Sequence, residues 1–313
     1  MNTTPSDPGR FRLAAAFFAI YFIWGTTYLA ALVGLEGMKP FVLSALRYLI
    51  AGTLMASWIF YRGIKWPRGK NVTVLLISGC LMLVGGSGLV VYGEQYINSG
   101  YAAVVVATEP LWFVLFDRKR WGFYFSSKQI IAGLLLGFAG VALFAVLSGS
   151  NVELRAGGLL PGTLIVLVSA MLWVGGTLYA ARISGSGSPQ VTSTCIQLLG
   201  GGLFAALIAL LLGEWGEFHP EAISTRVWVA LGFMVVFGSI IAYASFNWLV
   251  TVRPPAVVST HTYVNPVVAI VVGWAFAGES LSAGQIAALS VVLAGVILTQ
   301  TAKQKMTAPE PGS

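Results

Sequence analysis

The stretch GYAAVVVATEPLWFVLF, residues Gly100–Phe116, decides the fold. It is apolar enough to lie in lipid, yet it carries an acid at Glu109 and a proline at Pro110 near its middle. A charge at bilayer depth is costly, so an intramembrane carboxylate usually faces a cavity. The proline removes one backbone donor and weakens the helix beside the acid. The stretch therefore predicts a membrane helix with a functional carboxylate.

A second stretch repeats this arrangement later in the chain. Residues Ala256–Gly278, AVVSTHTYVNPVVAIVVGWAFAG, carry Asn265 and Pro266 at the place of the acid and the proline. The WGTTY of Trp24–Tyr28 is likewise echoed by the WVGGTLY of Trp173–Tyr179. A polar residue and a proline at matching places in two halves predict a binding site between two repeats.

The composition excludes a soluble protein. The chain has 313 residues, of which 57% are hydrophobic and 9% are charged, whereas soluble domains are about 25% charged. The net charge of +7 lies mainly in short loops, without a basic stripe interleaved with aromatics, so no nucleic-acid partner is expected. Cys80 and Cys195 lie in apolar segments without paired spacing, which argues against a disulfide or a metal site.

The sequence predicts about ten spanning helices, because each needs about 20 apolar residues. They are expected at Leu13–Gly34, Phe41–Tyr61, Val72–Tyr92, Gly100–Phe116, Ile130–Ser148, Leu159–Arg182, Val191–Gly213, Val227–Val250, Ala256–Gly278 and Gln285–Thr301. Lys and Arg gather in alternate loops, and most acids lie in the other loops. By the positive-inside rule, both termini are predicted to be cytoplasmic. Because five helices per half is an odd number, the second repeat is expected to be inverted.

The predicted fold class is therefore an all-α integral membrane protein. Its predicted parts are a cytoplasmic tail (residues 1–12), a first five-helix repeat (13–150), a second five-helix repeat (151–302) and a cytoplasmic tail (303–313). The first apolar run is longer than a signal-peptide core and carries Trp24 in mid-helix, so we interpret it as a retained span.

Four segments carry a resemblance to a known family. They are Ile23–Tyr28 (IWGTTY), Ala102–Pro110 (AAVVVATEP), Phe237–Tyr243 (FGSIIAY) and Tyr263–Ser282 (YVNPVVAIVVGWAFAGESLS). With them the chain resembles the EamA-type family of the drug/metabolite transporter superfamily, above all its YedA-like branch. The resemblance implies ten helices in two inverted repeats, and export of a small metabolite or drug across the inner (plasma) membrane.

One loop departs from the pattern of this family. The second half carries GESL at residues 278–281, whereas the corresponding place in the first half reads FDRKR at residues 116–120. A role shared by the two loops is therefore in doubt for the first half.

Glu109 and His261 are the titratable side chains that fall deepest in paired helices. A carboxylate in the cavity could take up a proton or hold a cationic group, and a histidine could exchange protons with it. We predict that the two form the proton-coupling element. The structural alternative for Glu109 is an acid that pairs with a neighbouring helix. The structural alternative for His261 is a hydrogen bond to a backbone carbonyl, and for His261 this alternative is favoured.

The predicted substrate-binding residues are polar or aromatic side chains within spans. They are Trp24, Tyr28, Arg47, Glu109, Trp112, His261, Tyr263 and Asn265. Arg47 either pairs with an acid such as Glu94 or Glu109, holds a substrate carboxylate, or extends to the outer interface. Gln197 and Asn247 bind substrate or make interhelical hydrogen bonds. Most other aromatics, including Trp173, Tyr179 and Tyr243, are expected to be packing or interface residues.

These features predict a secondary transporter that works by alternating access, coupled to protons or to exchange. No nucleotide-binding loop of the GxxxxGKS type is present. The alternatives are a channel or a membrane-embedded enzyme, but HExxH and GxSxG are absent and His261 has only Ser259 as a candidate partner. We predict no enzymatic activity and no cofactor. The expected partners are a small-molecule substrate and lipid. Gly133-x-x-x-Gly137 fits internal packing, with a homodimer contact as the weaker alternative.

Overall fold

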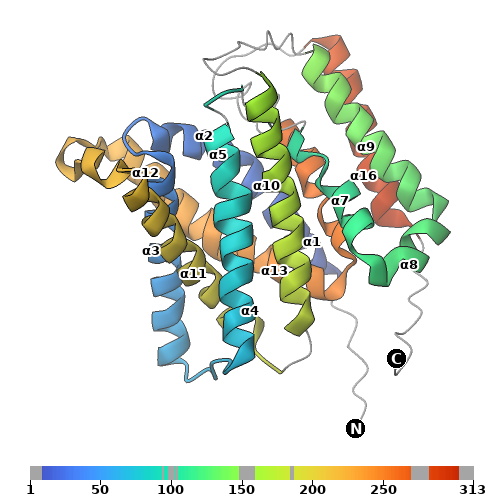
Figure 1. The fold of residues 1–313 in the computed structure, drawn as a ribbon. Helices are drawn as coiled ribbons and strands as arrows, with labels where there is room; N and C mark the ends of the chain where they lie inside the picture. Colours follow the sequence, from blue (N-terminus) through green and yellow to red (C-terminus); the bar gives the residue numbers. More distant parts are fainter. Residues whose placement is uncertain are drawn as a thin grey trace.

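A computed structural model describes residues 9–93, 95–97, 102, 105–147, 159–183, 187–268 and 282–302, without the side chains of residues 28, 32, 145 and 159. This part of the chain is helical and contains no strand (Figure 1). Seven of its helices are long and apolar enough to span a membrane, or eight if a pair bent by 94° counts as one span. The chain is a multi-pass membrane protein, but ten spans are not confirmed within the described residues.

The helices of the first half follow the predicted apolar runs. In chain order they are α1 (Arg10–Phe18), η1 (Ala19–Ile23), α2 (Trp24–Leu35), α3 (Pro40–Tyr61), α4 (Lys70–Gly79), η2 (Cys80–Gly88), α5 (Leu89–Gly93), α7 (Glu109–Phe116), η3 (Arg118–Arg120), α8 (Trp121–Ser126) and α9 (Lys128–Leu147). The segments α1, η1 and α2 form one span, Arg10–Leu35, and α4, η2 and α5 form another, Lys70–Gly93.

The second half follows its predicted runs except at the ninth, Ala256–Gly278, which a turn at residues 259–260 interrupts. Its elements are α10 (Leu159–Ala180), η4 (Ala181–Ile183), α11 (Gln190–Leu211), η5 (Glu214–Glu217), η6 (Pro220–Ala222), α12 (Thr225–Phe233), η7 (Met234–Ala242), α13 (Tyr243–Val252), α14 (Pro255–Val258), a helical segment at 261–268, and α16 (Ala283–Thr301). Both predicted tails lie largely outside the described residues, as do Glu94, the GESL loop and the ninth predicted helix beyond Val268.

The fourth predicted helix is not continuous, which corrects the expectation for Gly100–Phe116. A turn at residues 107–108 interrupts it, and α7 begins at Glu109. Pro110 explains the break, because its ring would clash with the carbonyl of a preceding helical turn, whereas a proline fits the first turn of a new helix. The acid therefore lies at a helix start and not in mid-helix.

Three long helices contain π-helical segments: η1, η2 and η7. Both η2 and η7 are nine residues long, and they lie in the third predicted span of each half. A π-helix leaves the regular pattern of backbone hydrogen bonds, and such segments are frequent at functional sites.

Helices from the two halves pack on each other in pairs. The helices α3 and α11 pack along their lengths, as do α9 and α16, and Figure 1 shows the second pair side by side at one edge of the molecule. Glycines allow these approaches: a Cβ atom added at Gly295 would lie 2.7 Å from the carbonyl oxygen of Gly133. A Cβ at Gly137 would lie 2.6 Å from the ring of Tyr263. The Gly133-x-x-x-Gly137 motif is thus occupied by internal packing.

Candidate functional site

Four aromatic rings from different helices meet inside the bundle; we call them the aromatic cluster. They belong to Trp24 on α2, Trp173 on α10, Phe246 on α13 and His261 on the segment 261–268. The ring centroid of Trp24 lies 4.9 Å from that of His261, 5.5 Å from that of Phe246 and 5.7 Å from that of Trp173. The cluster brings together Trp24 and His261 as predicted site residues, and its four rings are buried in the interior of the bundle.

Arg47 is joined to this cluster through η7. The indole Nε1 of Trp24 donates to the carbonyl oxygen of Gly238 at 3.0 Å. The guanidinium of Arg47 lies against the same residue, because a Cβ added at Gly238 would be 2.7 Å from Arg47 Nη2. Arg47 Nε also donates to Ser239 Oγ at 2.8 Å. A glycine at position 238 is therefore required for this close approach.

The position of Arg47 bears on two of its predicted roles. Ser239 lies halfway along the span Thr225–Val252, so Arg47 does not extend to the outer interface. Among the described residues it forms no ion pair with Glu109 or with any other carboxylate. Glu94 lies outside the described residues. Pairing with Glu94 and binding of a substrate carboxylate both stay predictions.

Glu109 carries one of two buried polar atoms that have no hydrogen-bond partner in the described part of the chain. Its side chain is 6% exposed, and Oε2 is unpartnered. The other atom is Nε1 of Trp173, on α10, and α10 packs against α7. The start of a helix favours an acid, but a favourable dipole does not supply a hydrogen bond. An unpartnered acceptor and an unpartnered donor on adjacent helices suit a ligand with both kinds of group.

His261 is held by its own backbone, as the structural alternative predicted. Its Nδ1 lies 3.2 Å from the carbonyl oxygen of Val258, and since a carbonyl only accepts, Nδ1 carries the hydrogen. A turn at residues 259–260 precedes His261, just as a turn precedes Glu109. By the place of this turn, His261 rather than Asn265 corresponds to Glu109. Ser259 Oγ donates to Ala256 and not to His261, so the two do not form a hydrolase-like pair.

Other predicted site residues make structural contacts. With the side-chain amide of Asn265 oriented so that its oxygen and its nitrogen both have suitable partners, the nitrogen donates at 3.0 Å to the carbonyls of Ile20 and Tyr21. Both carbonyls lie in the π-helical segment η1. The hydroxyl of Tyr263 donates to Leu134 O at 2.9 Å. Trp112 Nε1 donates to Thr108 Oγ1 at 3.0 Å, one turn earlier in the chain. None of the three is part of the aromatic cluster, and the side chain of Tyr28 lies outside the described residues.

Gln197 and Asn247 belong to a buried network between the two halves. Gln197 Nε2 donates to Ser78 Oγ at 2.9 Å, and Gln197 Oε1 accepts from Asn247 at 2.8 Å and from Tyr243 at 3.1 Å. Asn247 also donates to Thr194 Oγ1 at 3.1 Å. These groups satisfy one another, which agrees with the interhelical alternative and leaves little capacity for a ligand.

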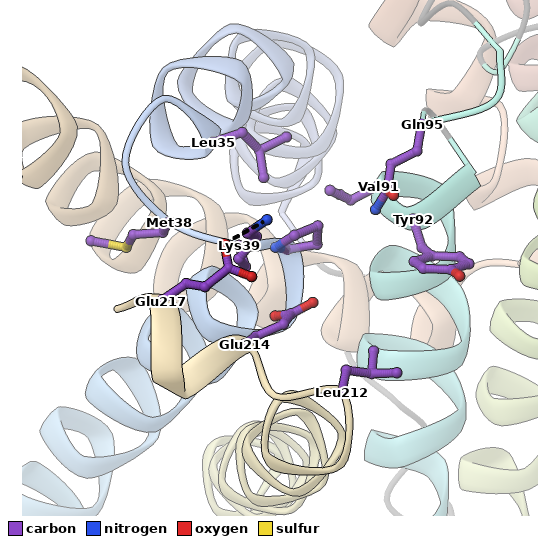
Figure 2. A pocket seen from close by; sticks show the side chains of 10 residues that line it. Leu35, Met38, Lys39, Val91, Tyr92, Gln95, Leu212, Glu214 and Glu217 are labelled. Carbon is purple, nitrogen blue, oxygen red and sulfur yellow. Dashed lines mark ion pairs between the residues drawn. The ribbon is translucent and has the colours of Figure 1, made fainter. Parts of the chain in front are cut away.

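A separate pocket of about 450 Å³ lies where α2, α5 and α11 end (Figure 2). An ion pair at 3.0 Å joins Lys39 to Glu217 at its rim, and Tyr92 and Gln95 stand on the opposite wall. Glu214 also lines the pocket, but its Oε2 accepts from the backbone N–H groups of Phe41 and Val42 at the start of α3. This carboxylate caps a helix, and the pocket has both polar and apolar lining residues.

Sequence reasoning missed four residues of the central site: Trp173, Phe246, Gly238 and Ser239. Gly238 and Ser239 lie within the FGSIIAY segment that carried the family resemblance, so a signal for their importance existed. Phe246 has no such signal, because its role depends on the rotation of α13. Within the described residues, no group of three His, Cys, Asp or Glu side chains could hold a metal ion.

Comparison with known proteins identifies the family of this chain. The EamA-like transporter family matches twice, at residues 12–146 and 160–301. A protein of Escherichia coli K12 named "Uncharacterized inner membrane transporter YedA" is 33% identical over 294 residues, which cover 93% of this chain and 91% of that protein. The "Uncharacterized transporter YvbV" of Bacillus subtilis is 26% identical over 309 residues, covering 97% and 95% of the two chains.

A solved crystal structure shares the fold. It superposes with a TM-score of 0.71 at 20% identity and covers 93% of this chain and 96% of its own. At this identity, the likeness concerns the fold alone. The two family matches together span most of the sequence, and they agree with the membrane-spanning architecture. This chain therefore belongs to the EamA-like transporter family.

Proposed function

We propose that this chain is a secondary transporter that moves a small organic solute across the inner (plasma) membrane by alternating access. The unpartnered Oε2 of Glu109 carries this proposal. A buried carboxylate oxygen that no described residue contacts by a hydrogen bond is costly, and such a group is typical of a site for a proton or a ligand. Glu109 and His261 are the proposed proton-coupling groups, and the aromatic cluster is the proposed contact with the solute. Export is the proposed direction, on family resemblance alone.

The symmetry of packing supports two inverted five-helix repeats with ten spans. The contacts pair corresponding predicted spans: the second with the seventh (α3 with α11) and the fifth with the tenth (α9 with α16). The first predicted span contacts the eighth (α2 with α12), and the sixth predicted span contacts the third (α10 with η2). These two contacts correspond, because the sixth span is the repeat of the first and the eighth is the repeat of the third. A two-fold axis between the repeats produces this pattern, in which each contact has a counterpart with the two repeats interchanged. Rocking of one repeat against the other would then open the central site to each side in turn.

Charge supports the proposed orientation, with both termini in the cytoplasm. Several arginines of the basic loops stack on aromatic rings near helix ends: Arg12 lies 4.5 Å from the Trp248 ring centroid, and Arg182 lies 4.8 Å from that of Tyr179. Such cation–aromatic pairs suit the membrane interface.

Exposed apolar side chains, such as Phe60 at 85% exposure, suit lipid as a partner.

The test uses purified protein in proteoliposomes. A library of small organic acids, amines and amino acids is screened for compounds that raise the melting temperature, because a ligand of the folded state stabilises it by mass action. Uptake of the strongest radiolabelled stabiliser is then measured with and without a pH gradient. We expect Glu109→Gln to abolish the stimulation by the gradient, whereas Glu217→Gln, a change in the exposed rim ion pair, retains it. Unchanged stimulation in Glu109→Gln would refute the coupling role.

A further inference from the structure

Arg47 is a cation in the interior whose hydrogen-bonding capacity is largely unused. A guanidinium offers five N–H donors, and the hydrogen bond that Arg47 makes to a described residue is the one from Nε to Ser239. Its Nη groups are not among the buried polar atoms without a partner, and Arg47 is only partly buried. The side chain thus keeps some exposed surface, and no described residue accepts a hydrogen bond from its Nη groups. The Tyr48 ring, 5.3 Å from the guanidinium carbon, supplies the only aromatic contact recorded for Arg47 in the described part of the chain.

Three helices enclose this guanidinium. Arg47 lies on α3, about 10 Å along the helix from its start at Pro40. Gly238 and Ser239 of η7 line one side, and a Cβ added at Gly238 would also lie 3.0 Å from Thr27 of α2. Thr27, Gly238 and Ser239 are all buried. The charge thus points into the bundle and not into lipid, where an unpaired cation would be far more costly.

The chemistry of the surroundings defines what would bind there. The planar fork of an arginine matches the two oxygens of a carboxylate or the oxygens of a phosphate. Trp24 and Arg47 both contact Gly238. Because Trp24 belongs to the aromatic cluster, Arg47 lies next to this cluster. An oxyanion at Arg47 would therefore place the body of its molecule near large apolar rings. Neither Trp24 nor Arg47 is committed to a carboxylate of the described chain.

We propose that Arg47 binds the carboxylate or phosphate of an organic anion whose aromatic or apolar body packs on the aromatic cluster. This inference rests on the proposed transport function and deepens it, because it assigns the substrate class. Gly238 serves as a positioning residue, since any side chain there would displace the guanidinium.

The test measures dissociation constants of the purified full-length protein for four probes of similar size. Phenylacetate is the carboxylate, phenyl phosphate the phosphate, phenylacetamide the neutral analogue and phenethylamine the cation. We expect an oxyanion to bind at least about tenfold more tightly than the amide, since a charge-assisted bidentate contact is worth more than about 1.4 kcal/mol. Whichever of phenylacetate and phenyl phosphate binds more tightly identifies the group that the site takes.

Variants separate the site from general effects of charge. Arg47→Gln should abolish the preference for the oxyanion, whereas Arg62→Gln, at an exposed helix end over Trp58, should retain it. If Arg47→Gln does not fold, Arg47→Lys provides the test, because it keeps the charge but loses the fork and should weaken binding several-fold. Absence of oxyanion binding in the wild-type protein, or equal binding by the Arg47 variant that folds, would overturn the proposal. Preferential binding of phenethylamine would also overturn it, while leaving proton-coupled transport through Glu109 intact.

Discussion

The crossing of α9 and α16 provides a sharp test of the fold. A Cβ added at Gly295 would lie 2.7 Å from both the carbonyl oxygen of Gly133 and the Cα of Gly137. Both atoms belong to the backbone of α9, so neither can rotate away as a flexible side chain would. Gly295→Ala must therefore push the two helices apart.

The expected cost follows from two opposing effects. Overpacking of a close contact typically costs about 1–3 kcal/mol, whereas alanine gains up to about 1 kcal/mol over glycine in helix propensity. Gly232→Ala is the matched control, because Gly232 lies in α12 with nothing within 4 Å of its added Cβ. The control receives the propensity gain without the clash. The difference in unfolding free energy between the two variants should thus be about 1–3 kcal/mol.

The assay is thermal unfolding of both variants in the same detergent, followed by tryptophan fluorescence. For chains of a few hundred residues, a loss of 1 kcal/mol lowers the melting temperature by roughly 2–4 °C. Gly295→Ala should therefore melt at a clearly lower temperature than Gly232→Ala. Equal melting temperatures would show that α9 and α16 do not cross at Gly295, and the packing of the fifth and tenth predicted spans would have to be abandoned.

Two further substitutions test buried polar contacts. Gln197→Met removes three buried hydrogen bonds, of which the one to Ser78 joins the two halves. Each is worth about 0.6–1.7 kcal/mol in membrane proteins, so the melting temperature should fall, whereas the exposed Gln95→Met should leave it unchanged; equal losses would contradict a role for the network. Asp117→Ala removes the buried carboxylate that accepts hydrogen bonds from Arg120 at 2.9 Å and from Tyr124 at 3.1 Å. Backbone amide hydrogen exchange should therefore become faster in α8, with little change in α3. Unchanged exchange in α8 would show that this carboxylate does not stabilise the segment.

The sequence by itself determined where the spans lie. The predicted runs Phe41–Tyr61 and Gln285–Thr301 differ by no more than two residues at either end from α3 (Pro40–Tyr61) and α16 (Ala283–Thr301). The reason is local: transfer of a segment into lipid depends on its own apolar length and on internal backbone hydrogen bonding. The fourth span was predicted as continuous, but Pro110 carried a local signal of weakness beside Glu109, and the turn lies at residues 107–108.

Only the tertiary structure decided which side chains meet. The contact of Arg47 with Ser239, the donation of Asn265 to the carbonyls of η1 and the position of Phe246 in the aromatic cluster all join residues far apart in the chain or on separate helices. These contacts depend on the rotation of each helix about its axis and on where glycines such as Gly238 let two backbones or a guanidinium approach. Hydropathy does not encode either quantity, because lipid solvates every face of an apolar helix alike, whereas packing distinguishes them.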